Sequence, residues 1–306
     1  MNKKLRLLPL VITVTVLTLF AAMFSCKGKN KAEAVKNTTE QVSPNAETIQ
    51  QIKNAEKVFN ALPSPLEIAQ LIKAAGAKFD ETLLNPIENQ SNYTTSKSMA
   101  LNLGVFSSDL SFASLYDQTS LIVNYMEAAK NMAKGLGILD AIDENTIEKL
   151  QQNINNREVI MEIVSETFLN SQSYLEDDQQ HAVAATIIAG GFIEGLYIST
   201  NMVDMKSFRG NKLVATIADQ KTSVKDLVRL LESYNDNTAI QELLGPIHEL
   251  DALFDKIERT TEPASTDVDS KTGITEITGS SKTEIKADEF LAIRNKVNEI
   301  RSSYIK

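Results

Sequence analysis

The sequence predicts an all-α protein in which antiparallel helical hairpins stack into one body. Three features of the 306-residue chain support this fold class. Long segments are rich in Ala, Leu, Ile, Lys and Glu, tryptophan is absent, and there are only seven prolines and twelve glycines. Hydrophobic residues make up 42% of the chain, which is enough to bury one large core or two modest ones.

The formal net charge is −9, so the chain is acidic. A protein that binds nucleic acid needs a basic face to displace counterions, and we find no stripe of Lys or Arg with interleaved aromatic residues. The sequence therefore predicts no nucleic-acid partner. The acid excess is typical of a surface that keeps a protein soluble.

Residues 1–25 have the pattern of an export signal peptide. Lys3, Lys4 and Arg6 precede an apolar segment, residues 7–24, that contains no charged residue. The length of this segment lies between that of a signal-peptide core and that of a membrane-spanning helix. Length alone therefore leaves two alternatives open, a cleaved leader and a single-pass membrane anchor.

Cys26, the one cysteine of the chain, follows this segment in the sequence Met23-Phe24-Ser25-Cys26. This arrangement resembles the lipobox of bacterial lipoproteins, with Met23 where that family usually has leucine and a bulkier residue than usual at Phe24. The resemblance implies cleavage before Cys26 and lipidation of its sulfur, and several acyl chains at about 0.8 kcal/mol per methylene would anchor the protein stably. A disulfide within the chain is excluded because there is no second cysteine.

Residues 26–47 are expected to form the lipidated cysteine and a flexible tether. Residues 27–47 are polar and lack periodicity, and such a coil would span on the order of 25 Å. The basic residues Lys27, Lys29 and Lys31 resemble the context in which lipoproteins are sorted to the outer membrane. We therefore expect a protein anchored there by lipid and facing the periplasm.

The helical body is predicted to span residues 48–260. The first well-marked helix, residues 66–76, has Ser64 as a cap, Pro65 at its first position, Glu67 in its first turn and Gly76 at its end. Apolar periodicity and turn residues predict the helices that follow at residues 94–116, 121–134, 143–153, 157–175, 179–203, 213–219, 222–234 and 238–259.

Residues 261–306 are expected to form a small β-hairpin and a final helix, both packed on the body. The hairpin would pair residues 273–278 with residues 283–286 across a turn at residues 279–282. Because it carries little apolar surface, it would need the helices for stability. The final helix begins at Asp288 and has one apolar side, made of Phe290, Ile293, Val297, Ile300 and Tyr304.

Two mostly apolar helices, residues 101–112 and 187–198, are the centre of the predicted body. Small residues share one face of the second helix at Gly191, Gly195 and Ser199, and one face of the first at Ala100, Gly104, Ser107, Ser111 and Ser114. We expect Gly104, Gly191 and Gly195 to let the two helices pack closely. The alternative is that the same glycines let a ligand approach the backbone.

Each of these helices also carries one acid among apolar neighbours, Asp109 in the first and Glu194 in the second. A buried carboxylate must be paired, hydrogen-bonded or neutral. Asp109 and Glu194 are therefore candidate ligand-binding residues, as a proton-sharing pair or a ligand anchor in an open cleft. The structural alternative, which we favour, is that they bind a Lys, an Arg or a helix end and fix the register of the helices.

No catalytic motif is present, and His181 and His248 do not form a metal-binding pair, so we predict no metal and no cofactor. Residues 101–110 and 190–197 resemble uncharacterised helical lipoproteins of Bacteroidota, which brings no activity with it. The leading hypothesis is a lipid-anchored cell-envelope protein whose helical domain binds an envelope protein or a small ligand without catalysis. The alternatives are an envelope hydrolase that uses Asp109 and Glu194, and a single-pass membrane-anchored helical protein.

Overall fold

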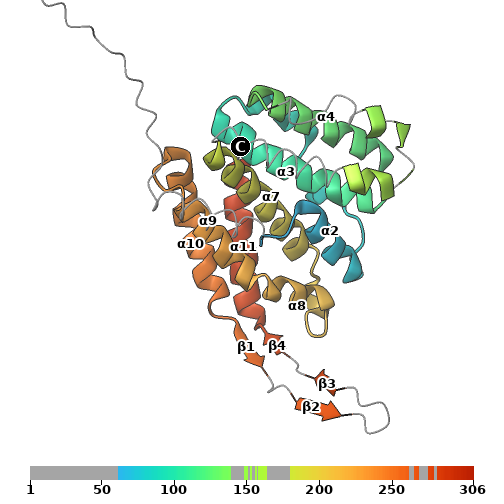
Figure 1. Cartoon of the computed structure of the whole chain (residues 1–306), viewed down its shortest axis with the longest axis vertical. Coiled ribbons are helices and arrows are strands. Elements are labelled where there is room, and N and C mark those ends of the chain that lie inside the picture. Colours follow the sequence, from blue (N-terminus) through green and yellow to red (C-terminus); the bar gives the residue numbers. More distant parts are fainter. Residues whose placement is uncertain are drawn as a thin grey trace, which may run out of the picture. The chain divides into compact units, whose positions relative to one another are not determined.

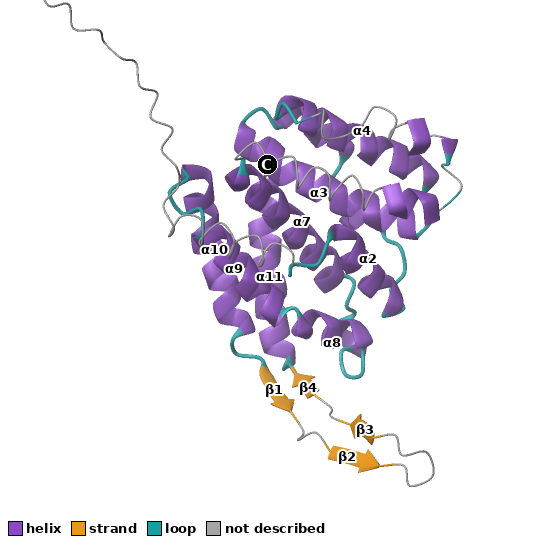
Figure 2. Ribbon diagram, in the orientation of Figure 1, coloured by secondary structure: helices purple, strands orange, loops and turns teal. Residues whose placement is uncertain are grey.

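Helices form most of the protein in the computed structural model, which describes residues 61–138, 148–150, 152–153, 156, 158–163, 180–261, 265–268, 275–278 and 281–306. All of these residues belong to one compact unit, residues 44–306. Figure 2 shows how completely helices dominate this unit, which agrees with the predicted all-α class. Cys26 and the predicted leader and tether lie outside the described residues, as does most of the predicted helices at 143–153 and 157–175.

The α-helices labelled in Figure 1 are α2 (Pro65–Ala74), α3 (Ser96–Leu115), α4 (Thr119–Gly135), α7 (His181–Asn201), α8 (Lys212–Asp219), α9 (Lys221–Glu232), α10 (Thr238–Phe254) and α11 (Ala287–Tyr304). Short 3-10 helices among the described residues are η1 (Glu81–Leu83), η2 (Ile87–Asn92) and η4 (Met205–Ser207).

Capping residues explain where several helices begin. Ser64 accepts a hydrogen bond from the backbone of Glu67, and the Glu67 carboxylate accepts one from the Ser64 backbone, so the predicted cap of α2 is confirmed. Thr95 and Ser98 form the same reciprocal arrangement at the start of α3. The side chain of Asn237 caps α10 in the same way that Ser64 caps α2, by accepting from backbone N–H groups.

α3 and α7 lie side by side in the centre of the unit, and the other helices pack around this pair (Figure 1). α4 and α2 contact α3, α11 contacts α7, and α9 and α10 pack on each other and on the α7–α11 side. Both central helices are buried over most of their length rather than on one face. Their apolar residues therefore supply much of the core, including the fully buried Phe106, Phe112 and Ile193.

Glycines bring the backbones of α3 and α7 into contact. A Cβ atom added to Gly104 would lie 2.0 Å from the carbonyl oxygen of Ile187 and 2.5 Å from the nitrogen of Gly191. A Cβ atom on Gly190 would lie 2.0 Å from the carbonyl oxygen of Leu101. Real Cβ atoms do not approach other atoms so closely, so the crossing requires glycine at these positions.

Two details of the predicted small faces are wrong. Gly195 does not face α3, because a Cβ atom there would meet Ile68 of α2 at 2.7 Å. Ser108, which was outside the predicted small face of α3, contacts α7, because its hydroxyl donates to the carbonyl of Gly191 at 2.8 Å. α7 therefore uses its glycines against two different helices.

The C-terminal strands do not pair as predicted. β1 (Glu258–Thr261) pairs with β4 (Ser281–Glu284), and β2 (Ser265–Val268) pairs with β3 (Thr275–Thr278), both antiparallel. The predicted hairpin of residues 273–278 with 283–286 is therefore wrong, and α10 ends at Phe254 rather than at 259 because β1 begins soon after it. Polar strands specify register weakly, which explains why the pattern misled the prediction.

The final helix follows its prediction. α11 buries every residue of the expected apolar side, namely Phe290, Ile293, Val297, Ile300 and Tyr304. Arg301 is buried with them and is 7% exposed. This arginine lies four residues after Val297, on the same side of the helix. Its guanidinium group forms a buried ion pair with Glu194 of α7.

Gly104→Ala should lower the free energy of unfolding by about 1–3 kcal/mol or more, since the added methyl group overlaps backbone atoms of α7 that cannot move without separating the helices. Urea unfolding of the purified protein measures the change. Gly245→Ala is the matched control, because Gly245 lies in helix α10 and nothing lies within 4 Å of an added Cβ atom. That control should be neutral or stabilising by up to about 1 kcal/mol. Equal effects of the two variants would contradict the close crossing.

Candidate functional site

The polar centre of the fold is an ion pair between Glu194 of α7 and Arg301 of α11. Nε of Arg301 lies 3.0 Å from Oε2 of Glu194, and Nη2 lies 3.0 Å from Oε1, so the guanidinium binds both carboxylate oxygens. Arg301 also donates to the carbonyl of Leu83 at 3.3 Å and lies 4.3 Å from the ring centre of Tyr197. This two-point geometry is the strongest form of the arginine–carboxylate interaction.

Asp109 of α3 lies beside this ion pair. Its Oδ2 accepts a hydrogen bond from the backbone N–H of Asn85 at 3.1 Å. Within the described part of the chain, the buried Oδ1 of Asp109 has no hydrogen-bond partner. Burial and the charge of Glu194 raise the pKa of Asp109 well above its ordinary value, although Arg301 opposes this.

Burial also raises the pKa of Glu194, but the charge and the hydrogen bonds of Arg301 lower it. Among the described residues no cation forms an ion pair with Asp109, whereas Glu194 has Arg301, so burial of a charged carboxylate costs more at Asp109.

The crossing of α3 and α7 explains why the two acids meet. Glu194 follows Gly191 by three residues, and Asp109 follows Ser108, whose hydroxyl binds the carbonyl of Gly191. The close approach of the backbones thus continues along both helices for about one turn and places both carboxyl groups in one enclosed volume. Sequence reasoning identified both acids, and the structure brings them together.

Asn85, which the sequence analysis did not single out, joins this cluster to a wider network. Its backbone N–H binds Asp109, and its side-chain amide donates to the hydroxyl of Tyr93 at 3.0 Å and to Oδ1 of Asn102 at 3.3 Å. Its carbonyl accepts from the hydroxyl of Tyr125 of α4 at 3.0 Å. Asn85 is fully buried in the short loop between η1 and η2, where a polar residue must find such partners.

The end of α11 is held by the same network. Nδ2 of Asn102 donates to the carbonyl of Tyr304 at 2.8 Å, and the hydroxyl of Tyr93 donates to the carbonyl of Ile305 at 3.5 Å. Together with Arg301, these bonds attach the last turn of α11 to α3, to α7 and to the loop that contains Asn85. Arg301 could have been suspected from the sequence, because it is the one cation on the apolar side predicted for the final helix.

This geometry does not form a ligand site. Asp109 and Glu194 are both 0% exposed, so the open cleft that a ligand or substrate would need is not present around them. The expectation that these residues bind a ligand is therefore not supported, and the partner of Glu194 is an arginine of the same chain. The arrangement agrees with the structural alternative, in which the two acids bind partners within the chain and fix the register of the helices.

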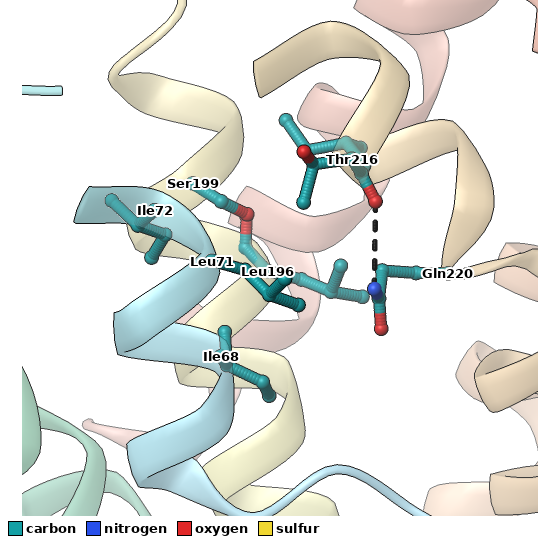
Figure 3. Close-up of a pocket in the computed structure, with 8 residues that line it drawn as sticks. Ile68, Leu71, Ile72, Leu196, Ser199, Thr216 and Gln220 are labelled. Carbon is teal, nitrogen blue, oxygen red and sulfur yellow. Dashed lines mark hydrogen bonds between the residues drawn. The ribbon is translucent and has the colours of Figure 1, made fainter. Parts of the chain in front are cut away.

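A shallow hollow lies beside α7, between α2 and α8 (Figure 3). It has room for roughly one water molecule and does not include Asp109 or Glu194. The side chain of Gln220 borders it and donates to the carbonyl of Thr216 at 3.4 Å. The other residues that line it are mainly apolar, namely Ile68, Leu71, Ile72, Leu196, Ser199 and Ile217.

Within the residues that the structure describes, no group of three or more His, Cys, Asp or Glu side chains is arranged to hold a metal ion. Each of the two histidines has a partner. His181 stacks on Tyr234 with ring centres 5.9 Å apart, and His248 lies 3.4 Å from a carboxylate oxygen of Glu232.

Comparisons of this chain with protein-family models, with curated proteins and with solved structures found no match. Only the chain's own residues therefore indicate its function. Among the described helices, α7 is long and apolar enough to cross a membrane by length and composition, but 83% of its apolar window is buried inside the protein. That burial is typical of the central helix of a globular domain.

Arg301→Met should lower the free energy of unfolding by about 3–5 kcal/mol, since it leaves the carboxylate of Glu194 buried without its cation. Thermal or urea unfolding at neutral pH measures this. Lys296→Met on the same helix is the matched control, because Lys296 pairs with the exposed Glu249 and Glu299 and its loss should cost no more than about 1 kcal/mol.

A double variant, Glu194→Met with Arg301→Met, tests the reason for this cost. Removing both charges leaves no unpaired ion in the core, so the double variant should be more stable than Arg301→Met alone. If the two changes instead add, the loss in each single variant comes from packing and not from an uncompensated charge.

Proposed function

We propose that this protein is a lipid-anchored component of the bacterial cell envelope whose helical domain binds a partner through its outer surface. One observation carries the proposal. An apolar leader ends at Met23-Phe24-Ser25-Cys26 and is followed by a polar tether and then by a large helical domain. This order of segments is typical of lipoproteins that hold a folded domain close to a membrane.

Two properties of the helical domain favour binding at the surface. The acids that could have formed an internal site are sealed, and Glu194 is neutralised by Arg301. The hollow beside α7 has room for little more than a water molecule. A partner protein of the envelope, which contacts a surface and needs no deep pocket, is therefore the partner that we propose.

The hydrolase alternative loses its support. It required Asp109 and Glu194 to reach a substrate, and both side chains are enclosed by α3, α7, α11 and the loop at Asn85. The single-pass membrane alternative concerns residues 7–24 and is an outcome of the experiment below.

Cys26→Ala should move the protein from the membrane fraction to the soluble fraction, because the variant has no sulfur to carry the lipid. Ultracentrifugation after an alkaline wash measures the distribution, and mass spectrometry of the N-terminal peptide detects the acyl chains. Asn45→Ala, in the tether, is the control and should stay in the membrane fraction. Density-gradient separation of inner and outer membranes then tests the expected outer-membrane location.

The opposite result has a clear meaning. If Cys26→Ala stays in the membrane fraction and keeps an uncleaved leader, residues 7–24 are a membrane-spanning helix and the lipid anchor is wrong. If wild-type protein is soluble and its N-terminal peptide carries no lipid, the whole envelope proposal fails.

A further inference from the structure

The connection from α7 to the first residue of α8, residues 204–212, is a basic loop on an acidic protein. The chain has a net charge of −9, whereas this loop has three basic residues, Lys206, Arg209 and Lys212, and one acid, Asp204. All three basic residues are exposed. Within the described part of the chain none of them forms an ion pair, so their charge is available to an anion outside the protein.

Local hydrogen bonds hold the backbone of the basic loop in one conformation. Oδ1 of Asp204 accepts from the backbone N–H of Lys206 at 2.9 Å, and Oδ1 of Asn211 accepts from that of Leu213 at 2.9 Å. Between them, Gly210 has a φ of +80°, which lets the chain turn where a side chain would cause strain. The basic residues therefore belong to an ordered surface.

Helix α11 attaches the basic loop to the helical body. Nη2 of Arg294 donates to the carbonyl of Val203 at 2.7 Å, and the ring of Phe208 meets that of Phe290 edge-on, with ring centres 5.3 Å apart. Leu291 is one of two large hydrophobic residues that are exposed in the described part of the chain, at 38%. It follows Phe290 directly and precedes Arg294 by three residues, so it lies on the side of α11 that contacts the loop.

We propose that the basic loop and Leu291 form a membrane patch, which binds the anionic headgroups of the bilayer to which the chain is anchored. The three cations attract negatively charged lipid, and the leucine beside them enters the boundary between headgroups and acyl chains. Basic residues next to an exposed apolar side chain are typical of surfaces that lie on anionic membranes. This inference rests on the lipid anchor proposed above.

The expected strength of this contact favours a tethered bilayer over a free acidic protein. Each Lys or Arg near an anionic bilayer strengthens binding roughly fivefold, so three of them contribute on the order of a hundredfold. A partner in free solution needs a tighter contact than this, whereas the proposed tether keeps the bilayer within a distance on the order of 25 Å. The acidic remainder of the chain is repelled by the same lipids, which turns the membrane patch toward them.

A single tryptophan tests the contact, because the wild-type chain has none. The full chain with Leu291→Trp is reconstituted into phosphatidylcholine vesicles with or without phosphatidylglycerol, in which brominated acyl chains quench tryptophan at short range. Fluorescence should be quenched in the vesicles that contain phosphatidylglycerol and stay unquenched in phosphatidylcholine alone. Raising NaCl from 0.1 to 1 M should abolish the quenching, since it shortens the screening length from about 10 Å to about 3 Å.

Asn124→Trp is the matched control for position. Asn124 is an exposed residue of α4, and α4 and α8 lie on opposite sides of the α3–α7 pair (Figure 1). Its tryptophan should not be quenched in either kind of vesicle, because the tether alone brings the body near the bilayer without burying this side in it.

Two triple variants, each combined with Leu291→Trp, test the charges. The first changes the basic residues of the loop and should reduce the contact equilibrium on the order of a hundredfold, so that quenching disappears. The second removes the same net charge from α4 and the C-terminus and should keep the quenching. The substitutions are Lys206→Gln, Arg209→Gln and Lys212→Gln in the first variant, and Lys130→Gln, Lys134→Gln and Lys306→Gln in the second.

The membrane patch is wrong if Leu291→Trp is quenched equally in both kinds of vesicle, or no more than Asn124→Trp. Quenching that survives the loss of the loop charges, or that disappears equally in both triple variants, also contradicts it. Quenching in neither kind of vesicle contradicts it as well, and leaves an acidic protein as the partner of the basic loop.

Flotation of the wild-type chain with the same vesicles tests the anchor separately. A chain that floats with both kinds of vesicle while Leu291→Trp stays unquenched contradicts only the membrane patch. A chain that floats with neither contradicts the anchor, and the membrane patch fails with it.

Discussion

The fold depends on one buried ion pair, that of Glu194 with Arg301. The two residues are 107 positions apart in the sequence, and their contact connects the central helix α7 with the last turn of α11. A buried ion pair adds little net stability, because the cost of removing two charges from water offsets their attraction. The ion pair instead selects one arrangement of the helices, since any arrangement that separates the two residues leaves an unpaired charge in the core.

The need for such a constraint follows from the two central helices. α3 and α7 are buried almost all the way round, so no polar face determines how each one is rotated against its neighbours. The glycines at positions 104, 190 and 191 determine where the backbones touch. The carboxyl groups one turn further on add a second, chemically different requirement, and only one arrangement satisfies both.

The sequence predicted the local features of this fold better than its long-range contacts. The cap at Ser64, the buried side of α11 and the unusual acids Asp109 and Glu194 were visible because each depends on residues within a few positions. The roles of Asn85 and Arg301 were missed because their partners come from other parts of the chain, 24 and 107 positions away. Gly195 was assigned to the wrong helix for the same reason, since a small residue shows that something packs closely but not what it is.

The free-energy cost of shifting α7 along α3 shows why a few polar residues can determine the helix register in a mostly apolar core. If α7 slid by one turn along α3, about 5.4 Å, apolar side chains would still meet apolar side chains and little hydrophobic burial would be lost. The same shift would separate Glu194 from Arg301 and Asp109, and an unpaired buried charge costs about 3–5 kcal/mol. That cost is comparable with the whole stability of a typical domain, about 5–15 kcal/mol. The register of α7 against α3 is therefore fixed by the free energy that shifted arrangements would lose at the ion pair of Glu194 and Arg301.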